Sequence, residues 1–586
     1  MNVLAVLLVS LVAFWLGYRF WARRVEEAFE ADGSHVMPSV TLRDDVDYVP
    51  TRKFVLFGHH FASIAGGGPI IGPTVALVFG WIPVWLWIVL GTVFIGVVHD
   101  FSALLASVRE RGRSMAEVAE RCFGRAGFLS FVGFTILMLL MITSVFLNLT
   151  TTALSSMYPA SFFGEMSAGV RTVTVNGVEN AVIGGIASSS VIFITLCAPL
   201  LGWLLYRRNL NAYVAGLLAT TVCAASVWLG LLWPLQLDPF RWMVILSVYT
   251  IFAAGVPVWL VLQPRDFTNS FMLYGGVAAI LGATVVLGLR GATVQAPAFN
   301  LAEALPHLGY VWPVLFITVA CGACSGFHSL VAGGTSSKQL AQERPDAKVV
   351  AAGGMVLEAV FAVGVVLAVG TALPFAEYTR IVFPTDPGAK ANPILAFALG
   401  IGGMFHAAYG LPKVYGTVFG ILMVEGFVVT TLDTAVRLNR YLFEELWRLL
   451  FPKPPRVLTS YVFNSFLCVG LMFVLAYFNA FKQLWTLFGS ANQLLAALTL
   501  LTVSVWLLRK GKRSLFALVP GLFMLGTTLA SLVLLLVTDY VPKGHRMLAV
   551  GDVLLLVLAL HVVHLVWRHR NDRGVDVVAG EAPTPA

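Results

Sequence analysis

Long apolar runs dominate this chain, and short polar stretches separate them. A membrane-spanning helix needs about 20 mostly apolar residues. Fifteen runs meet that requirement, so the pattern predicts an all-α polytopic membrane protein with about 15 transmembrane helices. The approximate limits of the runs are 2–20, 54–80, 82–108, 126–158, 182–205, 211–234, 242–262, 270–289, 312–335, 350–373, 412–435, 457–479, 484–508, 514–537 and 548–567.

The basic residues orient these runs. Lysine and arginine concentrate in loops that face the cytoplasm, and the first run is followed by Arg19, Arg23 and Arg24. The N-terminus is therefore predicted outside and the C-terminus in the cytoplasm, which places 29 of the 38 lysine and arginine residues inside. A further apolar run at 392–408 is predicted to lie at the external surface or to re-enter, because a full crossing would put the basic stretch 437–456 outside.

Composition excludes several classes of function. Of the 586 residues, 58% are hydrophobic and 12% are charged, about half the charged share of a soluble domain. This excludes a soluble enzyme, a disordered chain and a nucleic-acid-binding protein, in spite of the net charge of +8. The only close cysteine pair, Cys321 and Cys324, is too small a set for a structural zinc site. We expect a lipid bilayer as the surroundings, no enzymatic activity and no cofactor.

Two runs are interrupted where they should cross the middle of the bilayer. The second contains three consecutive glycines and a proline, and the seventh contains a milder interruption. Broken helices at matching positions of two halves mark the binding site in many transporters. The alternative is that glycine and proline only permit close packing or a kink. The predicted substrate-binding residues at the two breaks are Gly66, Gly67, Gly68, Pro69, Gly255 and Pro257.

The two breaks define a repeat. Five runs counted from each break give segments of similar length, 54–234 and 242–435, that start from opposite sides of the membrane. This is the pattern of a five-plus-five inverted repeat. The predicted organisation is a leading helix and cytoplasmic loop (1–53), a first half (54–234), a second half that includes 392–408 (235–456), and four trailing helices with a disordered cytoplasmic tail (457–586).

The first break has a specific chemistry. A helix that begins at Pro69 presents free N–H groups just after the proline and the positive end of its dipole, which suit an anion. The chain that ends near Ala65–Gly67 presents free carbonyls, which suit a cation. No lysine or arginine falls at that depth in the predicted spans. A small anionic substrate would therefore be held by helix ends and hydroxyl groups.

Several long motifs resemble a known family. The resemblance, to the carbon starvation protein A (CstA) family, covers nearly the whole chain. It implies an inner-membrane secondary transporter of pyruvate or, by older assignment, of peptides. It also implies similarity to the amino acid–polyamine–organocation superfamily, whose LeuT-like core is a five-plus-five inverted repeat. The matching stretches are 48–69 (YVPTRKFVLFGHHFASIAGGGP), 96–101 (GVVHDF), 112–114 (GRS), 263–266 (QPRD), 324–329 (CSGFHS) and 488–496 (FGSANQLLA).

Ionisable residues inside the spans are candidates for proton coupling. Such residues are functional by default and often form proton relays. The alternative is a structural hydrogen-bond cluster that closes the inner end, because the neighbours His59 and His60 point about 100° apart on a helix. A metal site is less favoured on ligand count. The predicted coupling residues are His59, His60, His99, Asp100, Glu358 and Glu425.

Three further polar positions have alternatives. By the superfamily resemblance, Asn148 lies on a core helix that commonly lines the substrate site, and its alternative is a hydrogen bond between helices. The same resemblance implies a sodium ion between Ala65 and the hydroxyls of Ser325 and Ser329, and oxygen ligands suit such a cation. The alternative for the serines is plain packing. The motif around Asn492 falls in the trailing helices, outside the core, and is expected to be structural or interfacial.

The favoured hypothesis is a secondary transporter in the bacterial inner membrane, coupled to protons or sodium. It would import a small carboxylate such as pyruvate under carbon starvation. The first alternative is a peptide transporter of the same fold. A membrane sensor is less favoured, because no link between runs is long enough for an output domain. The sequence carries no indication of the oligomeric state.

Overall fold

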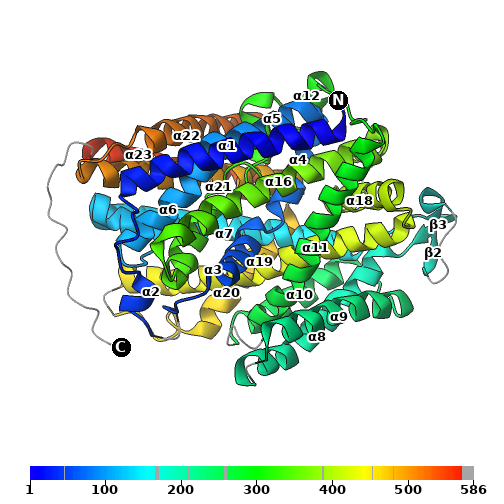
Figure 1. Ribbon diagram of the computed structural model, residues 1–586, viewed down its shortest axis with the longest axis horizontal. Coiled ribbons are helices and arrows are strands. Elements are labelled where there is room, and N and C mark those ends of the chain that lie inside the picture. The colour runs from blue at the N-terminus through cyan, green and yellow to red at the C-terminus, as the bar shows by residue number, and fades with distance from the viewer. Residues whose placement is uncertain are drawn as a thin grey trace.

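Helices make up nearly all of the structure (Figure 1). The computed structural model describes residues 1–44, 47–164, 170–208, 210–256, 261–385, 389–451, 453–479 and 481–569. Within those ranges, thirteen helical segments are long and apolar enough to cross a membrane. They correspond to thirteen of the fifteen predicted runs, which confirms the prediction of an all-α polytopic membrane protein.

The helices follow one another with short links. The first half of the chain contains α1 (Val3–Phe29), α2 (Pro38–Thr41), α3 (Lys53–Ala65), α4 (Gly68–Ala76), η1 (Leu77–Phe79), α5 (Trp81–Gly91), η2 (Thr92–Gly96), α6 (Val97–Arg109), α7 (Met115–Leu154), η3 (Ala160–Phe163), α8 (Ile183–Arg207), α9 (Ala212–Leu232), α10 (Pro239–Ala253) and α11 (Leu262–Leu289). The second half contains α12 (Leu301–His307), η4 (Val311–Leu315), α13 (Phe316–Thr318), α14 (Phe327–Val331), η5 (Ala332–Ser336), α15 (Ser337–Gln339), η6 (Glu343–Ala347), α16 (Lys348–Ala372), α17 (Phe375–Val382), α18 (Pro393–Tyr409), α19 (Lys413–Leu450), α20 (Tyr461–Phe478), α21 (Phe481–Arg509), α22 (Leu515–Leu535), η7 (Leu536–Tyr540) and α23 (Arg546–His569).

A small antiparallel sheet lies between α7 and α8. Its strands are β1 (Tyr158–Pro159), β2 (Thr172–Val175) and β3 (Val178–Ala181), in the order β1-β3-β2. The β2–β3 hairpin projects from one end of the molecule (Figure 1).

Local sequence explains several helix ends. Ser114 and Glu117 form a reciprocal capping box that starts α7. Asp238 caps α10, with a proline at the first helical position. Gly410, with φ of +72°, ends α18 in the left-handed region that favours glycine. Polar caps of this kind satisfy helix-end groups that would otherwise face an apolar interior.

Two predicted runs take a different form in the structure. The run 242–262 becomes the 15-residue helix α10, which ends at Ala253. The prediction of one continuous helix over 312–335 is wrong, because the chain there forms only short helical pieces, with an irregular stretch at 319–326. The reason is the small residues of that stretch: Gly326 packs so closely on α21 that a Cβ there would collide with the backbone carbonyl of Asn492.

Two further elements are deeply buried. The run 392–408 forms α18, which is mostly buried in the bundle, and whether it lies at the membrane surface or re-enters stays a prediction. The trailing helix α21, which the sequence places outside the inverted repeat, is almost entirely buried among other helices. It packs against α7, α22 and the irregular stretch at 319–326.

The predicted cytoplasmic loops meet at one end of the molecule. Lys512 forms an ion pair with Glu30, and Arg109 donates to the carbonyl of Phe29 at 2.9 Å. The same arginine lies 2.5 Å from a carboxylate oxygen of Glu343. Loops that are far apart in sequence and that carry most of the basic residues are therefore neighbours.

The N-terminus lies at the other end. Val294 donates to the carbonyl of Met1 at 3.2 Å, and Asn300 donates to that of Phe79 at 2.9 Å. The β2–β3 hairpin lies at the same end as the N-terminus, and α23 reaches the opposite end (Figure 1). The structure thus separates the two loop sets as the charge rule predicts. Which end faces the cytoplasm stays a prediction, and the predicted tail, from residue 570 on, lies outside the described residues.

Candidate functional site

The first break lies where the sequence predicts it. Helix α3 ends at Ala65, Gly66 has φ of +41°, and α4 begins at Gly68 with Pro69 in its first turn. The N–H groups of Ile70 and Ile71 both donate to the carbonyl of Gly67. The contact of an anion with N–H groups just after Pro69 stays a prediction, although these two N–H groups already have an acceptor in the structure. The N–H groups of Gly67 and Gly68 have no intrahelical acceptor by position.

The surroundings of this break are close. A Cβ on Gly66 would lie 3.2 Å from Thr431 Oγ1, and one on Gly67 would lie 2.8 Å from Val428 Cγ2. Both neighbours belong to α19. The break therefore packs directly on α19, and a side chain at either glycine would push the two apart.

A second interruption, the irregular stretch 319–326, lies against the first break. We call this stretch the second break; it is not the interruption predicted in the seventh run. A Cβ on Gly68 would collide with the side chain of Cys321, and one on Gly72 would lie 2.7 Å from the carbonyl oxygen of Thr318. The irregular stretch 319–326 thus packs directly on the start of α4. Two interrupted helices thus meet at their interruptions, and broken helices of this kind mark the binding site in many transporters.

Helix α21 holds the second break in place. Asn492 Oδ1 accepts a hydrogen bond from the N–H of Phe327 at 2.9 Å and one from the hydroxyl of Ser325 at 3.2 Å. Its own carbonyl accepts from the N–H of Gly326 at 3.2 Å. Gln493 donates to the carbonyl of Phe316. The motif expected to be structural is structural, and its position at the break is a finding of the structure.

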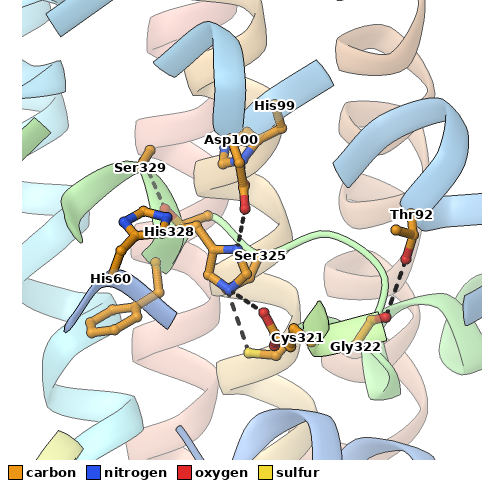
Figure 2. Close-up of polar contacts among 12 residues, drawn as sticks. His60, Thr92, His99, Asp100, Cys321, Gly322, Ser325, His328 and Ser329 are labelled. Carbon is orange, nitrogen blue, oxygen red and sulfur yellow. Dashed lines mark hydrogen bonds and ion pairs between the residues drawn. The ribbon is translucent and has the colours of Figure 1, made fainter. Parts of the chain in front are cut away.

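Two tryptophans satisfy further carbonyls of the second break. Trp87 Nε1 donates to the carbonyl of Val319 at 3.1 Å, and Trp485 Nε1 donates to that of Thr318 at 3.3 Å. Thr92, in the π-helical segment η2, donates to the carbonyl of Gly322 at 3.4 Å (Figure 2). Buried carbonyls need such partners, so α5 and α21 together fix the course of this stretch.

Four fully buried ionisable side chains lie next to one another beside the second break, and Figure 2 shows three of them, His99, Asp100 and His328. Asp100 Oδ1 lies 2.7 Å from Nδ1 of His99, and Asp100 Oδ2 lies 2.7 Å from Nδ1 of His328. On the other side of the ring, His328 Nε2 lies 3.1 Å from a carboxylate oxygen of Glu358. We call His99, Asp100, His328 and Glu358 the buried relay. It joins α6, α14 and α16.

The contacts of the relay restrict its protonation states. An ionised Asp100 accepts hydrogen bonds from Nδ1–H of both histidines. The second nitrogen of His328 then faces Glu358 in an ion-pair contact of 3.1 Å that lacks hydrogen-bond geometry. A proton at this contact would sit either on His328, which gives an imidazolium beside a carboxylate, or on Glu358, which gives a neutral pair. A buried group of this kind can gain or lose charge without moving its backbone.

The two adjacent histidines of α3 separate as their 100° spacing predicts. His60 is fully buried, and its Nδ1 lies 2.7 Å from Ser336 Oγ. Its ring packs on Gly354 of α16, one helical turn before Glu358. In the described part of the chain, its Nε2 has no hydrogen-bond partner. His59 stays half-buried. The structure therefore brings His60 next to the relay and leaves His59 outside it.

Glu425 lies apart from the relay, on α19. It is fully buried, and both carboxylate oxygens lack a hydrogen-bond partner in the described ranges. It borders a small cavity that Arg265 and Asn269 also line. Of the predicted coupling residues, His99, Asp100 and Glu358 therefore belong to the relay, His60 lies next to it, and His59 and Glu425 lie apart from it.

One buried arginine is not evident from the apolar runs, which place Arg265 between two spans. In the structure it lies in the first turn of α11, 2% exposed and 2.8 Å from Asp433 of α19. Tyr249 also donates to Asp433, at 2.9 Å. Arg265 lies at the beginning of its span, so the expectation that no basic side chain lies at mid-membrane depth stays a prediction. The QPRD motif at 263–266 is the signal of this buried arginine in the sequence.

Asn148 lines the larger polar cavity, of about 650 Å³. Its side-chain amide donates to the carbonyl of Ala476 at 3.1 Å, so it also makes the predicted hydrogen bond between helices. Lys390 and Lys482 line the same cavity, together with aromatic rings of α10, α20 and α21. Burial and the nearby Lys482 lower the pKa of His307 at its edge.

The predicted sodium ligands have other partners here. Ser325 Oγ lies within hydrogen-bonding distance of the Asn492 amide and of Cys321 Sγ. Ser329 Oγ donates to the carbonyl of Gly326 at 2.7 Å. Ala65 is fully buried at the end of α3. A sodium site on Ala65, Ser325 and Ser329 stays a prediction.

The interruption predicted in the seventh run takes no part in the contact between the first break and the stretch 319–326. A Cβ on Gly255 would collide with the hydroxyl group of Tyr461, on α20. Tyr461 in turn donates to the carbonyl of Ile251 at 2.7 Å. Gly255 thus has a packing role at the end of α10, and its predicted substrate contact stays a prediction. Pro257 lies outside the described residues.

In the described ranges, one set of three side chains lies close enough together to hold a metal ion: Asp32, His35 and Glu343. They stand at the end of the molecule where the basic loops meet. Glu343 already forms an ion pair with Arg109 at 2.5 Å. The arginine neutralises the carboxylate that a cation would need, so the set is better explained as an ion-pair group.

Comparison with known proteins settles the family. The model of the family "Carbon starvation protein CstA" matches residues 2–387 and 371–531. The chain belongs to the CstA family. The peptide transporter CstA of Bacillus subtilis (strain 168) is 31% identical over 563 residues, which cover 89% of this chain and 88% of the relative. The pyruvate/proton symporter BtsT of Escherichia coli (strain K12) is 27% identical over 611 residues, which cover 89% and 80%.

Two solved transporter structures match this chain at low similarity. A manganese transporter of Eremococcus coleocola, in complex with an aromatic bis-isothiourea compound, has a TM-score of 0.43 and 11% identity, and covers 90% of this chain and 98% of that one. MhsT in complex with L-phenylalanine has a TM-score of 0.42 and 13% identity, and covers 89% and 99%.

Family membership and the apolar helices together make this CstA-family chain a multi-pass membrane transporter and not an enzyme. The resemblance noted in the sequence is thereby confirmed. The relatives carry both peptide and pyruvate in their names, so the substrate and the coupling ion are matters for proposal.

Proposed function

We propose that this chain is a proton-coupled importer of a small carboxylate, of which pyruvate is the representative, in the bacterial inner membrane. The observation that supports this most is the buried relay, which ends on the second break. Its four side chains are fully buried and connected at 2.7–3.1 Å. Ionisable groups are costly in a membrane interior and persist there for function.

The substrate carboxylate would bind at the start of α4. There, the N–H groups of Gly67 and Gly68 and the positive end of the helix dipole lie where the break contacts Thr431, Val428 and Cys321. The Thr431 hydroxyl lies at the same place and can donate a further hydrogen bond. Such a site favours a carboxylate that is short enough to enter between the break and α19.

The coupling of proton movement to substrate transport is proposed because the buried relay and the substrate site lie beside each other. Cys321, which contacts Gly68, and His328, which carries the shared proton, belong to the same interrupted segment. A change in protonation alters the charge between α14 and α16, and the second break is the irregular part that can respond. A ligand shifts such an equilibrium only by its differential affinity for the two states, and the contact between the breaks supplies that difference.

Protons are favoured over sodium for a structural reason. The relay needs only one shared proton to change its charge, and its hydrogen bonds are already formed in the structure. The candidate sodium oxygens of Ser325 and Ser329 are engaged by Asn492 and by the backbone of Gly326. An ion would have to displace those hydrogen bonds.

Peptide transport is the second candidate. The cavity lined by Asn148, of about 650 Å³, is the size of a pocket for a drug-sized ligand and larger than a three-carbon acid needs. Its aromatic walls and the two lysines suit the side chains and the carboxyl end of a short peptide. Several relatives are named peptide transporters.

Uptake into proteoliposomes tests the proposal. Purified protein should accumulate radiolabelled pyruvate when an inward proton gradient is imposed, and a sodium gradient alone should not drive accumulation. Excess unlabelled pyruvate should compete, whereas di- and tripeptides should not. Competition by peptides, together with peptide uptake under the same gradient, would favour the second candidate. Accumulation that depends on sodium at equal pH would reject proton coupling.

A further inference from the structure

A deep apolar groove lies on the outside of the bundle, between α1, α5 and α22. Its volume is about 960 Å³. Leu86, Leu90, Val519 and Phe523 line it, and each is 40–59% exposed. Helices α1, α5 and α22 lie side by side along one edge of the molecule (Figure 1). The exposed apolar side chains of membrane-spanning helices face the lipid acyl chains, so this groove opens towards lipid.

The groove has one charged end. Arg24 is exposed and lines the groove beside Trp21, with its guanidinium 5.2 Å from the Trp21 ring centre. In the described ranges it has no carboxylate partner. The acidic residues that follow it on α1 are already engaged: Glu26 pairs with Lys348, Glu27 with Arg23 and Glu30 with Lys512.

The charged end lies where the basic loops meet. The ion pair of Glu30 with Lys512 places the end of α1 beside the link that leads into α22. That link also carries Arg513, which is exposed. At the opposite end, the groove is lined by Phe299 and Leu301 and is apolar. The groove therefore has the polarity of a phospholipid: one cationic end and a long apolar body.

The floor of the groove touches the second break. Trp87 lines the groove, packs on Phe316 with ring centres 4.4 Å apart, and donates to the carbonyl of Val319. Phe523 closes the same aromatic group at 6.3 Å from Trp87. An occupant of the groove therefore lies against the side chains that position the break.

We propose that this groove binds an anionic phospholipid, with the phosphate at Arg24 and the acyl chains over Trp87 and Phe316. Basic pockets between membrane helices on the cytoplasmic side bind anionic headgroups, and each basic residue near the surface contributes measurably. The lipid fills the space beside the aromatic floor and so stabilises the second break. This inference is independent of the transported substrate.

Lipid retention tests the proposal. Full-length protein, delipidated in detergent, is incubated with phosphatidylglycerol or phosphatidylcholine vesicles, re-isolated, and the bound lipid is measured by mass spectrometry. The wild type should retain phosphatidylglycerol in preference to phosphatidylcholine and gain thermal stability with it. Arg24→Gln should weaken phosphatidylglycerol retention about five-fold, the effect of one basic residue. Arg23→Gln, which removes a residue paired with Glu27, is the matched control and should not.

The acyl part is tested by filling the groove. Val519→Trp should abolish retention of either lipid, whereas Val533→Trp, at an exposed position of α22 away from the groove, should leave retention unchanged. Leu90→Trp fills the groove from α5 and serves if Val519→Trp does not fold. Equal retention of the two lipids by the wild type, or unchanged retention in a folded groove-filling variant, would overturn the proposal.

Discussion

At the scale of single residues, the proposed mechanism of proton coupling depends on one histidine that lies between two carboxylates. His328 is held by Asp100 on one nitrogen and by Glu358 on the other, and all three side chains are fully buried. Breaking a buried pair by removing one partner leaves an uncompensated charge. Substitutions that keep shape but change proton capacity are therefore the informative ones.

Replacement of Glu358 by glutamine should remove the pH dependence of transport. The wild type should take up substrate faster as the pH on the substrate side falls from about 8 to 5, the range over which histidine titrates. Glu358→Gln keeps the size of the side chain but cannot release a proton, so uptake should be slow at every pH. Initial rates in proteoliposomes measure this. Glu303→Gln, at an exposed position of α12, is the control and should keep the wild-type profile.

Only some of these residues could be predicted from the sequence. His60, His99, Asp100 and Glu358 could be found because charged groups are rare in apolar runs. Their connection could not, since His328 bridges them across spans more than 200 positions apart. Arg265 could not be predicted as a buried residue for a different reason. The preceding apolar run extends to residue 262, whereas helix α10 ends at Ala253. Arg265 therefore falls in an apparent link between two runs, although it lies in the first turn of α11.

At the scale of elements, the proposed transport function depends on the contact between the first break, at Gly66–Pro69, and the second break, at 319–326. The first could be predicted, because three glycines and a proline cannot continue a helix without cost. The second could not, because 319–326 contains no proline, and its small residues also suit a packed helix. What decides the matter is the partner: Asn492 and Gln493 on α21 offer hydrogen bonds to an open chain.

A Cβ at Gly68 should block transport by collision with Cys321. The added carbon would collide with both Cβ and Sγ of the cysteine, so Gly68→Ala should abolish substrate binding while the protein still inserts. Removing both atoms with Cys321→Gly in the same chain should restore part of the uptake. Binding affinity and uptake in the single and double variants measure the contact. Gly133→Ala, which meets no atom within 4 Å, should leave both unchanged.

Equal loss of binding in the single and double variants, with both folded, would contradict a direct contact between the breaks. It would then place the substrate elsewhere.

Loss of the Asn492 amide should destabilise the second break. Asn492→Ala leaves the N–H of Phe327 and the hydroxyl of Ser325 without their acceptor, which should lower the free energy of unfolding by about 1–3 kcal/mol. Thermal denaturation in detergent checks this. Ser504→Ala, on the same buried helix, removes a hydroxyl that bonds only to its own helix at Leu500, and should cause a smaller shift.

At the scale of the whole molecule, the charged loops divide the protein into two ends. The end that holds Glu30, Arg109 and Lys512 collects basic loops from across the sequence, and the other carries the N-terminus and the β2–β3 hairpin (Figure 1). The charge rule requires the first to face the cytoplasm. The sequence and the structure both indicate that the molecule has these two ends. The side of the membrane that each end faces has to be measured in the membrane.

Cysteine labelling should assign the two ends. In a Cys197→Ser background, which removes the least buried native cysteine, an impermeant maleimide should label Asn176→Cys on intact cells. Arg513→Cys should react only after permeabilisation. The reverse pattern would invert the map and would make the phospholipid groove open towards the outer leaflet.

The buried relay should couple proton entry to substrate entry through the crossed breaks. This coupling is measured by following proton and pyruvate fluxes together in proteoliposomes that contain the wild type or Asp100→Asn. The wild type should move protons with pyruvate and accumulate it against its gradient. Asp100→Asn should lose proton movement and accumulation yet retain pyruvate exchange at equal concentrations. Wild-type proton movement and accumulation in Asp100→Asn, with the variant folded and inserted, would contradict coupling through the relay.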